Sequence, residues 1–402
     1  MTTARALQLP APLKASIAIF LALWTIVAVF PMAWIALMSF RVPVDALAAN
    51  PMTVILAPVT RATDHGISLL ALALGVGALG LALVLPIRYG PAVLRRIAPA
   101  GRTRTSRVLG AFLWLCATAV LLFVVLPAAI AIAEWLIRPI PLVGVIAEPV
   151  FGVTLDHYEA VWIRHEFYRN FLNSLVVTIG VVSVSLTVGT LAGYALARAG
   201  STLAFWLLIA ALVFRALPHS VLVTGYVPFF LQSREILAPL WDSALTGWLF
   251  RSIAAQPPTL YGQPLAIILV LVAINQPFTI WMLRSFFANI PRELDEAARV
   301  DGCTYFGAFR RAIIPVMWPG VLTTGLFSFL LAYNDYLVTA LLLDAQSQTM
   351  VPAISQFLNR DTRASDQIEA IAAAVSIAAP LFLLVMVFQR QIVAGLTQGA
   401  VK

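Results

Sequence analysis

Long apolar segments separated by short polar loops make up most of the chain. Most of these segments can cross a bilayer, because a helix needs ~20 residues to span the hydrocarbon core. They do not alternate polar and apolar residues, as the strands of a membrane barrel do. The pattern therefore predicts an all-α polytopic membrane protein with about eight transmembrane helices. We expect these helices at roughly 15–40, 66–87, 108–137, 172–196, 204–232, 263–287, 318–343 and 369–389.

Composition and the placement of charge agree with a membrane protein. The chain is 61% hydrophobic and 11% charged, whereas a soluble protein carries about a quarter charged residues. Its net charge of +8 comes from arginines beside apolar segments, so we expect no nucleic-acid partner. Basic residues gather on one side of the predicted membrane, in both tails and in the loops near 88–107, 197–203 and 284–311. The positive-inside rule places that side, with both termini, in the cytoplasm.

Residues that could catalyse a reaction or bind a nucleotide are sparse. Lysine occurs only at Lys14 and Lys402, so the chain contains no phosphate-binding loop of the type G-x-x-x-x-G-K-[ST]. Cys116 and Cys303 have neither metal-site nor disulfide-framework spacing, and the four histidines form no ligand motif. We therefore expect neither an enzyme nor a cofactor bound by this chain. A partner must do any work that a nucleotide drives.

The stretch ELDEAARVDG, Glu293 to Gly302, holds the only acidic residues on the cytoplasmic side. It is predicted to be a helix, because Pro291 suits the first helical turn and the acidic side chains favour the positive N-terminal end. Gly302 is a natural stop, since it takes the left-handed conformation that closes many helices. One face collects apolar side chains at helical spacing, namely Leu294, Ala297 and Ala298. The two alanines let another surface approach closely.

A second helical piece is expected from Thr304 to Ala312, with Pro315 ending it. The two pieces would form a helical elbow on the cytoplasmic side. The residues alone leave two interpretations open. The elbow could contact a protein partner, or it could lie among lipid headgroups with its arginines on the phosphates.

The spacing within this loop resembles a known motif. Permease subunits of binding-protein-dependent ATP-binding-cassette importers carry an EAA motif, E-A-A-x3-G-x9-I-x-L-P. The matching positions in this chain are Glu296, Ala297, Ala298, Gly302, Ile314 and Pro315. Ala312 stands where the family has Ile, and Ile314 where it has Leu, which should alter packing more than role. Asp301 before Gly302 resembles the carbohydrate branch of the family.

Other landmarks extend the resemblance along residues 1–41 and 150–390. They are Ser39-Phe40-Arg41, Asn173-Ser174, Tyr194-Ala195-Leu196-Ala197-Arg198, Arg215-Ala216-Leu217-Pro218 and Tyr333-Asn334-Asp335-Tyr336. Together they resemble the second, shorter permease of maltose-type transporters. The family core has about six helices, so the resemblance divides the chain into three parts. These are the N-terminal tail and first span (1–41), an inserted helix pair with an Arg-rich cytoplasmic loop (60–140), and the permease core (150–402) with its EAA loop at 291–315. The insert has no assigned role; lipid anchoring, contact with a neighbouring subunit and tolerated accretion stay open.

The resemblance implies a function that needs several partners. These are a second permease subunit, a cytoplasmic ATPase dimer that holds ATP-Mg, and a periplasmic or lipid-anchored solute-binding protein. The complex would lie in the bacterial cytoplasmic (inner) membrane, in contact with its lipid, and import a sugar or related polyol. Coupling to the ATPase would fall to Glu296, Ala297, Ala298, Asp301, Gly302, Ile314 and Pro315.

Three polar residues inside predicted spans are candidates for the solute path or a gate. Arg215 is costly in a membrane and is functional by default, although an ion pair between helices would also explain it. Asn334 and Asp335 could bind solute or close a gate, or they could cap a broken helix. The alternative function is an ion-coupled secondary transporter of a small polar solute. That class needs deep acidic residues and usually two similar halves. The sequence shows no such repeat, and deep acidic residues are scarce beyond Asp335.

Overall fold

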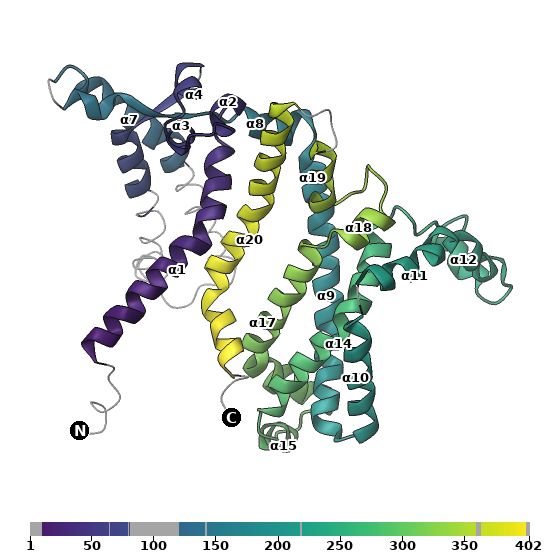
Figure 1. The fold of residues 1–402 in the computed structure, drawn as a ribbon. Coiled ribbons are helices and arrows are strands. Elements are labelled where there is room, and N and C mark those ends of the chain that lie inside the picture. The colour runs from purple at the N-terminus through teal and green to yellow at the C-terminus, as the bar shows by residue number, and fades with distance from the viewer. Residues whose placement is uncertain are drawn as a thin grey trace. The chain divides into compact units, whose positions relative to one another are not determined.

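The computed structural model describes residues 10–63, 65–78, 80, 120–140, 143–217, 219–358 and 363–398. Helices make up nearly all of its regular structure (Figure 1). The chain divides into two compact units, Met1–His157 and Tyr158–Lys402, each described here by itself. Within the described residues, five helices are long and apolar enough to cross a membrane. Their ranges are Pro12–Met38, Phe167–Ala199, Pro264–Ala288, Tyr305–Tyr333 and Ala364–Gln389.

The first unit begins with α1 (Ala11–Met38), the predicted first span. This helix is apolar all round and exposes large side chains along its length, as a helix in contact with lipid does. Short elements follow it and form a small cap. They are α2 (Pro43–Ala46), α3 (Pro51–Leu56), α4 (Pro58–Thr63), β1 (His65–Ser68) and β2 (Pro149–Val153).

Two buried charged residues hold this cap together. The Arg41 guanidinium donates to the carbonyl oxygens of Val54 (3.0 Å), Ile55 (3.1 Å) and Gly152. Asp45 accepts hydrogen bonds from the amide and the hydroxyl of Thr60, at 2.6 and 2.7 Å. Burial lowers the pKa of the Arg41 guanidinium, and the negative charge of Asp45 opposes that shift. The end of the first span is therefore fixed by satisfied polar contacts.

The two strands enclose the predicted insert. β1 pairs antiparallel with β2, and Gly66 lies opposite Gly152. The pairing brings the two ends of the intervening segment side by side. The described parts of this segment are a helix at Leu69–Ala78, η1 (Leu121–Val125), α7 (Leu126–Ile137) and η2 (Gly144–Ala147). The predicted span therefore starts at Leu69 and not at 66, because residues 65–68 pair as a strand. The Arg-rich loop predicted in the insert lies outside the described residues.

The second unit is built around four long helices. They are α9 (Phe167–Ala199), α14 (Pro264–Ala288), α17 (Ile314–Tyr333) and α20 (Ala364–Gln398). α9 and α14 approach closely, since a Cβ on Gly189 would lie 2.6 Å from Cγ2 of Thr279. A buried hydrogen bond joins α14 to α17, where the Asn275 amide donates to the Ser328 hydroxyl at 2.7 Å. Such interhelical polar contacts are typical of helix packing in membranes.

Two predicted spans differ from single helices. The segment 204–232 is two helices, α10 (Thr202–Arg215) and α11 (His219–Leu231). The break falls at residues 216 and 217, directly before a proline in the sequence, which restricts the residue that precedes it. The segment 318–343 is also divided, because α17 ends at Tyr333 and α18 covers Leu337–Leu342. The spans predicted near α1, α9, α14 and α20 are confirmed as long helices.

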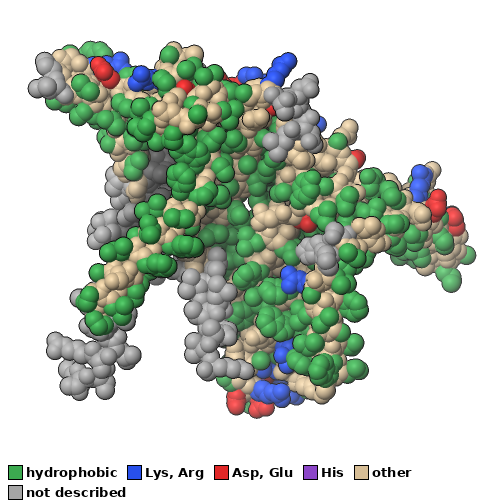
Figure 2. Space-filling view, in the orientation of Figure 1, with side chains coloured by type: hydrophobic (Ala, Val, Ile, Leu, Met, Phe, Trp, Pro, Cys, Tyr) green, Lys and Arg blue, Asp and Glu red, His purple; other side chains and the backbone are tan. Residues whose placement is uncertain are grey.

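The remaining elements of the second unit are short. Those outside the long helices are α8 (Asp156–Glu159, which straddles the two units), η3 (Ala160–Arg164), α12 (Ser233–Asp242), α13 (Gly247–Ile253), α15 (Glu293–Val300) and α19 (Met350–Leu358). Two more, α16 (Tyr305–Ala308) and η4 (Phe309–Ile313), lead into α17. Hydrophobic side chains cover most of the visible surface of this unit, and charged side chains gather at the end that carries α15 (Figure 2). This distribution suits a protein whose middle lies in lipid.

Candidate functional site

The predicted helix at ELDEAARVDG is present as α15 (Glu293–Val300). Three acidic residues occupy its first turn, as the helix dipole favours. Pro291 lies just outside the first turn, because the helix begins at Glu293 and not at the proline. Gly302 has φ +85°, the left-handed conformation expected of a helix stop, and it has open space around it.

One side of α15 is free for a partner. No residue of the helix is buried, and Glu296 and Ala297 are exposed while Ala298 is partly buried. Glu296 makes no ion pair or side-chain hydrogen bond within the part of the chain that the structure describes. An exposed carboxylate beside two alanines can accept an incoming basic side chain while the backbone comes close. Asp301 is also exposed, directly before the glycine.

The opposite side of α15 is tied to the long helices by Asp295. This carboxylate forms an ion pair with Arg198 at 2.8 Å and accepts a hydrogen bond from the Tyr194 hydroxyl. The Arg198 guanidinium also donates to the carbonyl oxygens of Ile290 (3.1 Å) and Phe287 (3.4 Å). One arginine at the end of α9 therefore joins the end of α14 to the first turn of α15. We call Tyr194, Arg198 and Asp295 the polar node.

An apolar cluster lies directly beneath the polar node. The Tyr194 ring packs on Phe287 of α14 and Phe309 of η4, with centroids 5.5 and 4.8 Å apart. Ile313 is fully buried in the same cluster. Of the two predicted residues beside it, Ile314 is partly buried and Pro315 is exposed. Ile314 therefore contributes to packing, whereas Pro315 shapes the backbone.

The prediction that Pro315 ends the second helical piece is wrong. Helical structure continues without a break from Tyr305 to Tyr333. Between Phe309 and Ile313 the helix widens into a π-type turn, in which the Ile314 amide donates to the Phe309 carbonyl. Pro315 directly follows this π-type turn and lies inside the continuous helix, where it donates no backbone hydrogen bond. The second piece of the elbow and the transmembrane helix α17 therefore form one continuous helix, whereas α15 is separated from it by residues 301–304.

The predicted solute-path residues lie away from α15. The Arg215 guanidinium at the end of α10 sits over the Phe278 ring of α14, 4.7 Å from its centroid. It makes no ion pair within the described residues, so the interhelical ion pair considered from sequence is not present there. The positive guanidinium instead makes a cation–π contact with the face of the Phe278 ring. This contact links α10 to α14 within the membrane.

Asn334 and Asp335 occupy the break between α17 and α18. The Asn334 side-chain amide donates to the Leu330 carbonyl at 3.1 Å. The Asp335 carboxylate accepts from the Thr339 amide at 3.0 Å. Both side chains therefore cap helix ends, which was the alternative to a solute contact. The 29 residues from Tyr305 to Tyr333 make a helix about 43 Å long, so this break and α15 lie at opposite ends of it.

Sequence reasoning missed the role of the polar node. Arg198 and Tyr194 were recognised only as landmarks, and Asp295 only as a charge at a helix start. One signal was available: Arg198 lies at the predicted short loop 197–203, on the same predicted side of the membrane as the acidic stretch, and opposite charges attract. Their pairing could not be deduced from spacing, because Tyr194 and Asp295 are 101 positions apart.

Comparisons with known proteins converge on one family. Residues 185–398 match the family described as binding-protein-dependent transport system inner membrane component. The diacetylchitobiose uptake system permease protein DasC of Streptomyces coelicolor is 32% identical over 252 residues, covering 62% of this chain and 81% of that protein. The trehalose transport system permease protein SugB of Mycobacterium tuberculosis is 31% identical, covering 62% and 82%.

Two further matches extend over more of the chain. The probable ABC transporter permease protein y4oR of Sinorhizobium fredii is 30% identical over 305 residues, covering 75% of this chain and 99% of that protein. Among solved structures, a bacterial ABC transporter involved in the import of the acidic polysaccharide alginate matches 72% of this chain and 98% of its own. That match is remote, with 18% identity and a TM-score of 0.39.

Proposed function

This chain belongs to the binding-protein-dependent transport system inner membrane components, and on that premise we propose that it is a sugar permease. It is one of two permease subunits of an ATP-binding-cassette importer and moves a sugar or related polyol into the cytoplasm. The observation that carries the proposal is α15, an exposed EAA helix that is joined to three transmembrane helices. The uptake systems of two relatives, named for diacetylchitobiose and trehalose, support a saccharide as the solute.

The subunit carries out the mechanical part of transport. A cytoplasmic ATPase dimer binds ATP-Mg and hydrolyses ATP, while this chain supplies no nucleotide site of its own. Glu296, Ala297 and Ala298 would seat α15 in a cleft of the ATPase, with Glu296 opposite a basic side chain. Asp301 and Gly302 end the helix and set its angle. The positive-inside rule favours both termini in the cytoplasm, and in that orientation α15 would be able to reach the ATPase.

Force from the ATPase reaches the membrane by two routes. The polar node passes movement of α15 to α9 and α14, because Arg198 binds the first turn of α15, the Phe287 carbonyl of α14 and the Ile290 carbonyl just after it. The continuous helix from Tyr305 to Tyr333 passes the same movement into α17, with Ile314 packed and Pro315 in its first turn. A rigid elbow of this kind can switch the spans between inward-facing and outward-facing states.

The solute path is a separate part of the proposal. Arg215, Asn334 and Asp335 are its candidates, and their present contacts suggest a gate more than a pocket. The hydrogen bonds that Asn334 and Asp335 make at the break between α17 and α18 would keep the gate closed until α17 moves. A second permease would supply the other wall, and a periplasmic or lipid-anchored solute-binding protein would deliver the solute.

Purification from native membranes tests this assignment. A tag on this chain should recover an ATPase and a second permease, and cells lacking the chain should lose uptake of one saccharide from a labelled panel. Replacement of the chain by the Glu296→Lys variant should recover the same partners without restoring uptake. Normal growth and uptake of every saccharide in the deletion strain would contradict the assignment to sugars.

A further inference from the structure

The segment 344–349, which we call the strap, is an irregular connection between α18 and α19. A turn shapes its first half, where the Ser347 amide donates to the Asp344 carboxylate at 2.9 Å. The backbone groups of such a segment need hydrogen-bond partners from other parts of the fold. Several of those partners lie on α9, as many as 178 positions earlier in the chain.

Two asparagine side chains near the start of α9 hold the backbone of the strap. The Asn170 amide donates to the Gln348 carbonyl at 2.9 Å. The Asn173 amide donates to the same carbonyl at 3.2 Å and to the Gln346 carbonyl at 3.4 Å. Both asparagines therefore bind backbone carbonyls, so the contact does not depend on which side chains the strap carries.

A serine on the same face of α9 holds the point where the strap enters α19. The Ser174 hydroxyl is buried and accepts a hydrogen bond from the Met350 amide at 2.9 Å. α19 itself lies beside the end of α9 that is remote from α15 (Figure 1). Positions 170, 173 and 174 share one helix face, because they have the spacing i, i+3, i+4. We call Asn170, Asn173 and Ser174 the latch.

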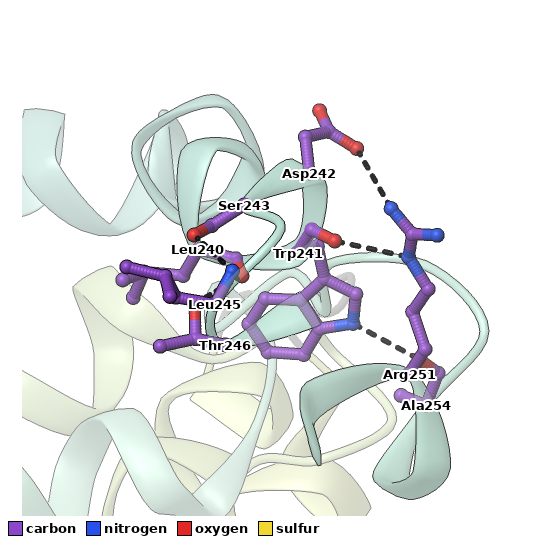
Figure 3. A network of polar contacts seen from close by, with 8 residues as sticks. All are labelled: Leu240, Trp241, Asp242, Ser243, Leu245, Thr246, Arg251 and Ala254. Atoms are coloured by element: carbon purple, nitrogen blue, oxygen red, sulfur yellow. Dashed lines mark hydrogen bonds and ion pairs between the residues drawn. The ribbon is translucent and has the colours of Figure 1, made fainter. Parts of the chain in front are cut away.

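Another connection of the second unit is held in a different way. The α12–α13 hairpin keeps its shape through contacts within itself, and all those drawn in Figure 3 join residues between 240 and 254. The Trp241 indole N–H donates to the Ala254 carbonyl at 2.9 Å, and the Arg251 guanidinium donates to the Trp241 carbonyl at 3.0 Å. A connection between helices can thus be held by its own residues, whereas the strap is held by α9.

α9 is suited to carry a movement from one of its ends to the other. Its 33 residues make a helix about 50 Å long. Each of the other three long helices contains an internal proline, and α9 contains none; the prolines are Pro277, Pro319 and Pro380. A proline removes a helical hydrogen bond and favours a kink. α9 is therefore the stiffest of the four, with the latch at its start and the polar node at its end.

We propose that the strap is carried by α9, so that movement of α15 at one end of this helix displaces the strap at the other. The inference rests on the proposed import function, in which an ATPase moves α15 and the strap faces outward. The polar node joins α15 to α9, and the latch joins α9 to the strap. The covalent route through α17 is less direct, because α17 ends at Tyr333 and α18 begins only at Leu337.

A reversible bridge between the strap and α9 tests whether the two move together. The transporter is purified with its partners through a tag on this chain, in a background with Cys116→Ser and Cys303→Ser, and is reconstituted in vesicles. Asn173→Cys and Gln348→Cys are then bridged with a short bis-methanethiosulfonate reagent. ATP-dependent uptake should stay within twofold of the unbridged rate. Loss of uptake that a reductant restores would show that the strap leaves α9 during transport, which would overturn the proposal.

Spin labels measure the displacement in the same background. The labels are placed at Gln346→Cys on the strap and at Asp242→Cys on the hairpin, where the side chain is 80% exposed. Their separation should shift by several ångströms between the nucleotide-free state and the state trapped with ATP and vanadate. Asn170→Ala with Asn173→Ala should remove at least half of that shift. The matched control, Gln356→Ala, removes a 2.6 Å hydrogen bond from α19 to the strap and should keep the whole shift.

The outcomes separate this inference from the proposed function. Uptake without ATP in the unbridged parent would refute the import function itself. Where parent uptake requires ATP, two results overturn the carried strap alone. These are the absence of any shift in the parent, and an equal shift in the parent and in the variant that lacks both asparagines of the latch.

Discussion

Removal of the Asp295 carboxylate tests how the elbow is joined to the spans. In Asp295→Ala, Arg198 loses its ion pair at 2.8 Å and Tyr194 loses its acceptor. The two charged side chains are only 17% and 15% exposed, and leaving one partner of a buried pair alone costs ~3–5 kcal/mol. Arg198 keeps two carbonyl acceptors, so we expect a smaller loss than that range, about 2–3 kcal/mol. At ~1.4 kcal/mol for each factor of ten, α15 should open about 30- to 150-fold more often.

Hydrogen exchange of the backbone amides between Glu293 and Gly302 measures this opening directly. Protection should fall by the same factor in Asp295→Ala and should stay unchanged in Glu296→Ala, whose side chain has no partner within the described chain. A double-mutant cycle with Arg198→Ala should show that the two effects are not additive. Protection within threefold of the parent in Asp295→Ala would refute the polar node as the joint.

Three further variants probe other parts of the account. Glu296→Lys should insert and assemble but lose uptake or uncouple it from ATP hydrolysis, because it places a positive charge opposite the expected basic partner; normal uptake would contradict the coupling role. Gly302→Ala should weaken the end of α15 by about 1–2 kcal/mol, because φ is +85° and an L side chain is strained there. Exchange of the Asp301 and Gly302 amides would reveal it, and Gly302→Asn should cost less. Asp45→Ala should leave the buried Thr60 amide without an acceptor and remove one of the two hydrogen bonds of its hydroxyl, which keeps the Val42 amide, and should destabilise the cap by about 3 kcal/mol. Faster proteolysis of residues 47–63 in the purified protein is the expected readout, and an unchanged rate would oppose it.

Features that depend on residues close together in the sequence were predictable. The long apolar runs predicted α1, α9, α14 and α20, because length and hydropathy decide whether a helix can span a bilayer. Acidic residues before EAA and a glycine after it predicted both ends of α15, since capping depends on nearby residues. The break near position 218 was visible as a proline, although its consequence, two separate helices, was not.

Features that depend on distant partners were not predictable. The β1–β2 pairing joins residues far apart in sequence, so Gly66 opposite Gly152 left no local pattern to detect. The π-type turn before Pro315 exists because packing of Phe309 and Ile313 favours a continuous helix over the break that proline alone suggests. The polar node likewise required knowledge of which loop ends meet beside α15.

The most direct test of the account is the energy source for uptake. The chain, its second permease and its ATPase are reconstituted in vesicles with the solute-binding protein, and saccharide uptake is measured with ATP, with a non-hydrolysable analogue and with ionophores. The account predicts uptake that requires ATP hydrolysis, persists when ionophores collapse all ion gradients, and disappears in Glu296→Lys. Uptake that needs no ATPase subunit and stops with the ionophore would contradict it.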